Sequence, residues 1–164
     1  EAQNYFSAPP ATYSNGETGQ CEISGEIQAQ VTPFLDPCFG GYIEVEYRGE
    51  DRCGFQMYDM VQIPVDPALP PTLSLPQLPT LLTCDEAQNY FSAPPATYSN
   101  GETGQCEIRG AIQADISLNG SGCESNVVVS YNGTDICGNP LTGLHTISVY
   151  LPVFQMPVDD GEII

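Results

Sequence analysis

Residues 1–23 read EAQNYFSAPPATYSNGETGQCEI, and residues 86–108 repeat this stretch letter for letter. A copy of this length, 85 positions further along, is typical of a tandem array in which each unit is a small domain joined to its neighbour. Cell-surface stalks, adhesins and fibres are built in this way, whereas enzymes seldom are. The repeat therefore predicts a structural protein rather than an enzyme.

The likeness between the copies extends past the identical stretch. Cys38 falls on Cys123, and after the loss of one residue the pattern Tyr-x-Gly-x-Asp-x-Cys-Gly at residues 47–54 recurs at residues 131–138. Apolar residues and glycines persist while polar residues drift, as expected if the fold is kept and the surface is free to change.

Composition narrows the class of protein. Acidic residues outnumber basic ones 21 to 3, and the formal net charge is −18. Nucleic acids and anionic membranes attract clustered Lys and Arg, so both are disfavoured as partners. Seven cysteines in 164 residues point to an oxidising compartment. No apolar run approaches 18 residues, so no membrane insertion is expected in this segment.

The spacing of apolar residues is that of β-strands. They alternate with polar residues around residues 43–47 and 127–131, and again around residues 61–65 and 147–151. A period of two buries one face of each strand. Turn signals such as Asn-Gly separate the runs. No window of ten residues has apolar residues at helical spacing without a Gly or Pro that interrupts it. We expect an all-β chain of tandem small immunoglobulin-like β-sandwich repeats joined by a proline-rich linker.

The repeat and the composition set the domain boundaries. Residues 1–66 are predicted to form the first repeat and residues 80–153 the second, with residues 154–164 beginning another linker or a tail. Because residue 1 corresponds to residue 86, the first repeat is expected to lack its first strand.

The linker, residues 67–79, contains five prolines and no charged residue. This composition favours an extended, polyproline-like path over a flexible coil. Its leucines would be a liability in water, so we expect them to pack along a domain edge or a neighbouring chain. They are Leu69, Leu73, Leu75 and Leu78.

Strand lengths restrict the pairing of the cysteines. Cys123 and Cys137 stand at opposite ends of one predicted strand, about 30 Å apart at about 3.3 Å per residue, whereas a disulfide needs Cα atoms about 4.4 to 6.8 Å apart. Cys106 and Cys123 lie at opposite ends of a predicted hairpin. The pairs that remain are Cys106 with Cys137, Cys84 with Cys123 and, by the repeat, Cys21 with Cys53, which leaves Cys38 unpaired in this segment.

These motifs resemble a known family. Thr83-Cys84-Asp85, the stretch NGETGQCEI at residues 100–108 and the Tyr-x-Gly-x-Asp-x-Cys-Gly-Asn pattern at residues 131–139 are similar to hyalin-type (HYR-like), immunoglobulin-like repeats of giant Bacteroidota surface proteins. The resemblance is to gliding-motility adhesins and filaments exported by the type IX secretion system. It implies a repetitive extracellular thread and no particular ligand. Phe55 stands where Asn139 does, which is a departure from the motif in the first copy.

The shared motif suggests mechanical roles for its residues. The tyrosines, Tyr47 and Tyr131, are expected to end a strand with a buried ring and a hydroxyl that caps nearby backbone. The aspartates, Asp51 and Asp135, are expected to accept backbone N–H bonds in the next turn, where the glycine after the cysteine adopts a positive φ.

Calcium binding is the functional alternative for the acidic residues, because calcium binds clustered oxygen ligands. The candidates are Asp51, Asp135, Asp85 and Glu86. The sequence has no Asp-x-Asp-x-Asp loop, and no other cofactor is expected.

No catalytic motif is present. Gly-x-Ser-x-Gly and His-Glu-x-x-His are absent, and the single histidine, His145, is expected to be exposed on a strand. The aromatic pairs at residues 5–6 and 90–91 fit either a patch on which sugars stack or core packing, and core packing is favoured.

The sequence therefore predicts a structural repeat of a secreted bacterial surface adhesin or filament, acting as a rigid disulfide-stapled spacer in adhesion or gliding. Its expected partners are neighbouring repeats of the same chain and, in a filament, lateral chains. Three alternatives stay open: a calcium-stiffened rod, a carbohydrate-binding module and a self-assembling extracellular fibre subunit. Secretion and anchoring signals are expected outside this segment.

Overall fold

The computed structural model describes residues 4–121 and 124–150. The described part of the chain is mostly β, with 55% of it in strands and one short helix. The chain divides into two compact units. Unit 1 comprises Glu1–Thr72, Ser99–Arg109 and Asp135–Asn139, and unit 2 comprises Leu73–Tyr98, Gly110–Thr134 and Pro140–Ile164.

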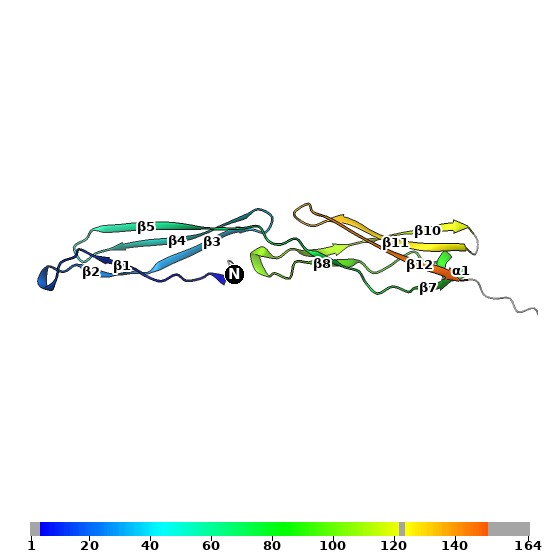
Figure 1. The fold of residues 1–164 in the computed structure, drawn as a ribbon, viewed down its shortest axis with the longest axis horizontal. Helices are drawn as coiled ribbons and strands as arrows, with labels where there is room; N and C mark the ends of the chain where they lie inside the picture. The colour runs from blue at the N-terminus through cyan, green and yellow to red at the C-terminus, as the bar shows by residue number, and fades with distance from the viewer. Residues whose placement is uncertain (1–3, 122–123, 151–164) are drawn as a thin grey trace, which may run out of the picture. The chain divides into compact units, whose positions relative to one another are not determined.

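Unit 1 contains a two-stranded and a three-stranded sheet (Figure 1). The smaller sheet pairs β1 (Ala11–Ser14) with β2 (Ser24–Ile27). The larger has the order β3 (Ala29–Asp36), β4 (Gly40–Glu50) and β5 (Gln56–Val65), all antiparallel. The strands predicted around residues 43–47 and 61–65 are confirmed.

In the larger sheet of unit 1, the alternation of apolar residues buries one face of the central strand. Ile43 and Val45 on β4 are 2% and 4% exposed. The turn into β4 is fixed by Asp36, whose Oδ1 accepts hydrogen bonds from the backbone N–H of Cys38 at 2.8 Å and of Phe39 at 3.0 Å. The sequence alternation thus specifies which face of the sheet is apolar.

Unit 2 holds a four-stranded sheet with the order β10, β11, β12 and β7. The bounds are β7 (Leu81–Thr83), β10 (Ala114–Ser121), β11 (Glu124–Thr134) and β12 (Pro140–Tyr150). The long strands are antiparallel, whereas β7 runs parallel to β12. Val127, Val129 and Tyr131 on β11, and Ile147 on β12, are at most 1% exposed. The strands predicted around residues 127–131 and 147–151 are therefore confirmed within the described residues.

A further sheet has the order β6 (Thr72–Ser74), β8 (Ala96–Ser99) and β9 (Arg109–Ile112). Its buried side chains include Ala96, Tyr98 and Ile112. Short 3-10 turns, η2 (Gly19–Cys21) and η3 (Gly104–Cys106), precede β2 and β9 in the two copies of the repeat. The identical sequence thus forms the same strand and turn elements twice.

Helix α1 (Cys84–Gln88) follows β7 and was not predicted from the sequence. Thr83 is its N-cap and forms a capping box with Glu86: Glu86 N–H donates to Thr83 Oγ1 at 3.3 Å, and Thr83 N–H donates to Glu86 Oε2 at 2.8 Å. The Thr-x-x-Glu spacing at residues 83–86 is the sequence signal that predicts this start.

Part of the linker joins a sheet. Residues 72–74 form β6, and the side chains of Leu73 and Leu75 lie close to Gly143 on β12. The prediction that linker leucines pack on a domain edge is confirmed for these two, whereas Leu69 is 75% exposed.

The disulfide arrangement differs from the prediction. Cys137 is bonded to Cys38, with 5.2 Å between their Cα atoms, and not to Cys106. Cys21, Cys53 and Cys106 carry free thiols. The predicted Cys21–Cys53 and Cys106–Cys137 bonds, and the unpaired state of Cys38, are therefore wrong in this structure. Elimination by strand length considered partners within one repeat, whereas the bonded residues are 99 positions apart.

The predicted bond between Cys84 and Cys123 stays a prediction, because Cys123 lies outside the described residues. The Cys38–Cys137 bond is of the kind that persists in oxidising compartments.

Candidate functional site

The tyrosine hydroxyls of the shared motif tie strands β4 and β11 to the Pro-Pro pairs at residues 9–10 and 94–95. Tyr131 Oη donates a hydrogen bond of 3.0 Å to the carbonyl oxygen of Pro94, and Tyr47 Oη donates an equal bond to that of Pro9. Tyr131 is fully buried, and this burial raises the pKa of its phenol, with a smaller contribution from Tyr90. The predicted bond from each hydroxyl to backbone is confirmed. Both tyrosines lie within their strands rather than at the ends, however, and the Tyr47 ring is only half-buried.

The aspartates of the motif organise tight turns. Asp51 Oδ1 accepts from the backbone N–H of Cys53 at 2.8 Å and of Phe55 at 3.0 Å. Gly54 adopts a φ of 86°, which suits a residue without a Cβ. Phe55 does not disturb this turn, because the aspartate binds its backbone rather than its side chain.

In the second copy of the turn, both carboxylate oxygens of the aspartate accept hydrogen bonds. Asp135 Oδ1 accepts from the N–H groups of Cys137 and Asn139, each at 2.8 Å, and Asp135 Oδ2 accepts from Asn139 Nδ2 at 2.8 Å. Asp135 is only 5% exposed. Desolvation, the largest single contribution, raises its pKa, but the hydrogen bonds from Asn139, Cys137 and Gly138 together hold the pKa below its ordinary value.

Three of the four calcium candidates accept structural hydrogen bonds through their carboxylates. Asp51 and Asp135 bind turn N–H groups, and Glu86 Oε2 accepts from the N–H and Oγ1 of Thr83. These bonds lower the pKa of Glu86. Asp85 lies in the first turn of α1 beside Glu86. Across residues 4–121 and 124–150, no three His, Cys, Asp or Glu side chains gather as a metal site.

His145 on β12 holds the linker. Its Nε2 lies 3.2 Å from the carbonyl oxygen of Pro79. The residue is half-buried, so the expectation of an exposed histidine is corrected. This bond could not be predicted from the sequence, because it depends on the linker running beside β12.

Two phenylalanines of the identical stretch face solvent. Phe6 is 74% exposed and Phe91 is 81% exposed, so the expectation that they pack in a core is wrong. Phe91 lines a cavity of about 180 Å³ in unit 2, which also includes Tyr90, Ile116 and Leu118. Its lining thus comes from apolar side chains of β10 and from the segment that follows α1.

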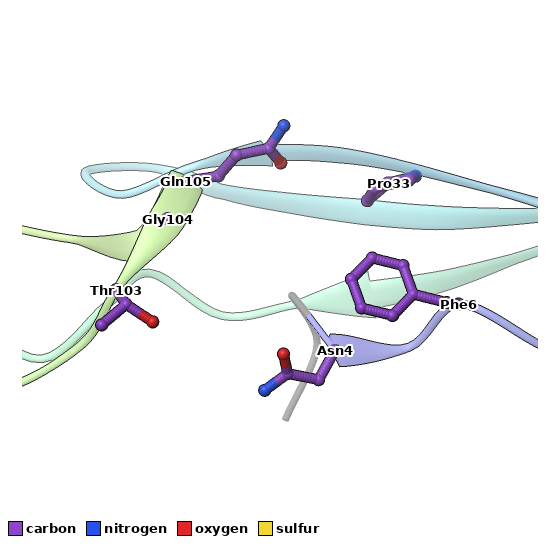
Figure 2. Close-up of a pocket in the computed structure, with 6 residues that line it drawn as sticks. All are labelled: Asn4, Phe6, Pro33, Thr103, Gly104 and Gln105. Atoms are coloured by element: carbon purple, nitrogen blue, oxygen red, sulfur yellow. The ribbon is translucent and has the colours of Figure 1, made fainter.

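A second pocket, of about 330 Å³, lies in unit 1. Figure 2 shows the residues that line it, none of which is charged: Asn4, Phe6, Pro33, Thr103, Gly104 and Gln105. Its lining contains no histidine, cysteine or charged residue.

Comparison with known proteins identifies no relative: no family model, curated protein or solved structure matches the chain. Among the residues that the structure describes, no helix is long and apolar enough to cross a membrane.

Proposed function

We propose that this chain is a structural repeat segment of a secreted surface adhesin or filament, in which the repeats act as disulfide-linked spacers. The observation that carries the proposal is the duplication of one set of internal bonds. The Tyr47–Pro9 and Tyr131–Pro94 bonds have the same length, and the turns at Asp51 and Asp135 use the same backbone acceptors and donors. A spacer requires units that hold their own shape without a ligand.

The Cys38–Cys137 bond supports a mechanical role. It closes a loop of 99 residues, which would otherwise extend under load by about 330 Å at about 3.3 Å per residue. The resemblance to hyalin-type repeats of gliding-motility adhesins favours the same role, with export by type IX secretion in a bacterium.

Single-molecule pulling from the two ends tests the spacer function. The oxidised chain is expected to stop short of its full contour length by about 330 Å, and the reduced chain to reach it. Equal extension with and without reductant would contradict the covalent restraint.

Surface exposure is tested separately. Antibodies against the folded chain are expected to label intact source cells, and external protease is expected to remove the signal. Labelling that requires permeabilised cells would overturn the extracellular assignment.

One observation favours a second candidate function, carbohydrate binding. Phe91 is 81% exposed at a cavity that also contains Tyr90, and sugars stack on exposed aromatic rings. Glycan-array binding that disappears in Phe91→Ala would support it, with Phe55→Ala as the control at another exposed phenylalanine.

A further inference from the structure

The larger sheet of unit 1 ends in a strand whose inner face is open. Ile63 and Val61 on β5 pair in register with Ile43 and Val45 on β4. The β4 residues are 2% and 4% exposed, but Ile63 is 36% exposed and Val61 is 49% exposed. On this face of the sheet, the side chains are therefore buried on β4 and open on the neighbouring strand β5.

Unit 2 provides the matched comparison. Aligning Tyr47 with Tyr131 places Ile63 on Ile147, the same residue type at the same position of β12. Ile147 is fully buried, with 0% exposed. The two isoleucines thus differ in exposure although the residue type is the same, so the difference comes from what packs over them.

The segment beside β12 in unit 2 is the chain from Leu73 to Thr83. Leu81, Leu82 and Thr83 of β7 pair in parallel with Ser148, Val149 and Tyr150 of β12, and Leu82 is 8% exposed. Further contacts continue along this edge: Thr80 O accepts from Ser148 N–H at 3.2 Å, Pro79 O lies 3.2 Å from His145 Nε2, and Leu73 and Leu75 adjoin Gly143.

The corresponding edge of β5 has no strand partner within residues 4–121 and 124–150. We call Val61, Ile63 and Val65, with the adjoining free backbone edge of β5, the acceptor edge. Exposed edges with apolar side chains are the places where proteins add a further strand.

We propose that the acceptor edge of unit 1 binds an extended, uncharged, leucine- and proline-bearing strand with the chemistry of residues 72–83. The occupant lies parallel to β5 and buries leucine side chains on Val61 and Ile63. This proposal stands apart from the spacer function, because it rests on the comparison of two sheets.

Charge restricts the occupant. Asp59 and Asp66 stand on and just after β5, and the whole chain has a net charge of −18. Residues 67–83 carry no charge, whereas residues 151–164 carry three acidic residues. Like charges repel, so the uncharged segment is the better match.

One residue limits the backbone pairing. Pro64 stands where Ser148 donates its N–H to Thr80 O, and proline has no N–H to donate. Binding at β5 therefore depends more on the burial of Val61 and Ile63 than on a continuous ladder. The side chain of Ile63 is the position at which to test it.

The test titrates a fluorescent peptide of residues 70–83 with the oxidised 164-residue chain and measures anisotropy. Saturable binding is expected. Ile63→Asn is expected to weaken it by about tenfold or more, because the transfer of one apolar side chain accounts for at least that factor. Gln62→Asn, on the opposite face of β5, is the matched control and is expected to bind as the unmodified chain does.

Hydrogen exchange keeps the test decisive if Ile63→Asn folds poorly. In the unmodified chain, the peptide is expected to slow exchange at β5 amides. Absence of binding, binding that survives Ile63→Asn, or protection confined to β12 would overturn the proposal. None of these outcomes alters the pulling or cell-labelling results that test the spacer function.

Discussion

Tyr131 and Pro94 are joined by a 3.0 Å hydrogen bond from a fully buried hydroxyl to a backbone carbonyl 37 residues earlier in the chain. Tyr131→Phe removes the donor and leaves the packing of the ring in place. We expect a loss of about 1 kcal/mol in the free energy of unfolding, the usual net value of such a bond. Urea unfolding followed by circular dichroism measures it.

Tyr47→Phe is the matched variant in unit 1. Tyr47 makes the same 3.0 Å bond but is only half-buried, so water can replace part of what is lost. A larger loss in Tyr47→Phe than in Tyr131→Phe would contradict this account of burial.

The raised pKa of Tyr131 also predicts behaviour in alkali. The unfolded phenol ionises near its ordinary pKa of 10.0, whereas the folded phenol resists ionisation. The contribution of Tyr131 to stability is therefore fully present below pH 10 and is expected to be lost as the pH rises through the folded pKa. Tyr131→Phe should flatten that part of the stability curve.

Gly110 is required by the ring of Tyr98. A Cβ placed at Gly110 would lie 2.4 Å from Tyr98 Oη, and Tyr98 is only 8% exposed. Gly110→Ala is expected to cost about 1–3 kcal/mol, the range for overpacking in a core. Gly25→Ala makes the same clash with Tyr13, which is half-buried and freer to move, so its cost should be smaller. Thermal melts of both variants compare them.

The sequence predicted the long strands because their pattern is local. Period-two alternation on β4 and β11 is decided by adjacent residues, and the Asp turns follow from short-range hydrogen bonds. Helix α1 was not predicted, although the sequence contains its signal: Thr83 and Glu86 have the spacing of a capping box.

The features that the sequence did not predict depend on distant neighbours. The partner of Cys137 lies 99 residues away, and the exposure of Phe91 depends on which strands approach it. The residues next to Phe91 in the sequence do not distinguish an exposed phenylalanine from a buried one. Ile63 and Ile147 likewise match in sequence and differ in exposure because only one has a covering strand.

The lowered pKa of Asp135 predicts a loss of stability in acid. Its folded pKa lies below the unfolded value of 3.8, so the unfolded state binds the proton first. The stabilisation is present above about pH 4 and is lost as the pH falls through the folded pKa. Glu86, whose pKa is also lowered from 4.5, adds to the same trend. Thermal midpoints between pH 2 and pH 6 measure it.

Asp135→Asn is expected to make the melting temperature less dependent on pH in this range. Asp115→Asn, at an exposed position on β10, controls for the loss of one negative charge. If both variants keep the full acid dependence, the turn at Asp135 is not its source.

The disulfide predicts the largest single change in stability. In the chain-entropy model, a bond that closes a loop of about 100 residues contributes about 4.7 kcal/mol. Cys137→Ser is therefore expected to lower the free energy of unfolding by several kcal/mol. Cys53→Ser removes an exposed free thiol at the matching position of the first copy and is expected to leave stability nearly unchanged. Peptide mapping without reductant provides the direct check: a Cys38–Cys137 peptide is expected, and a Cys106–Cys137 peptide would restore the pairing inferred from strand lengths.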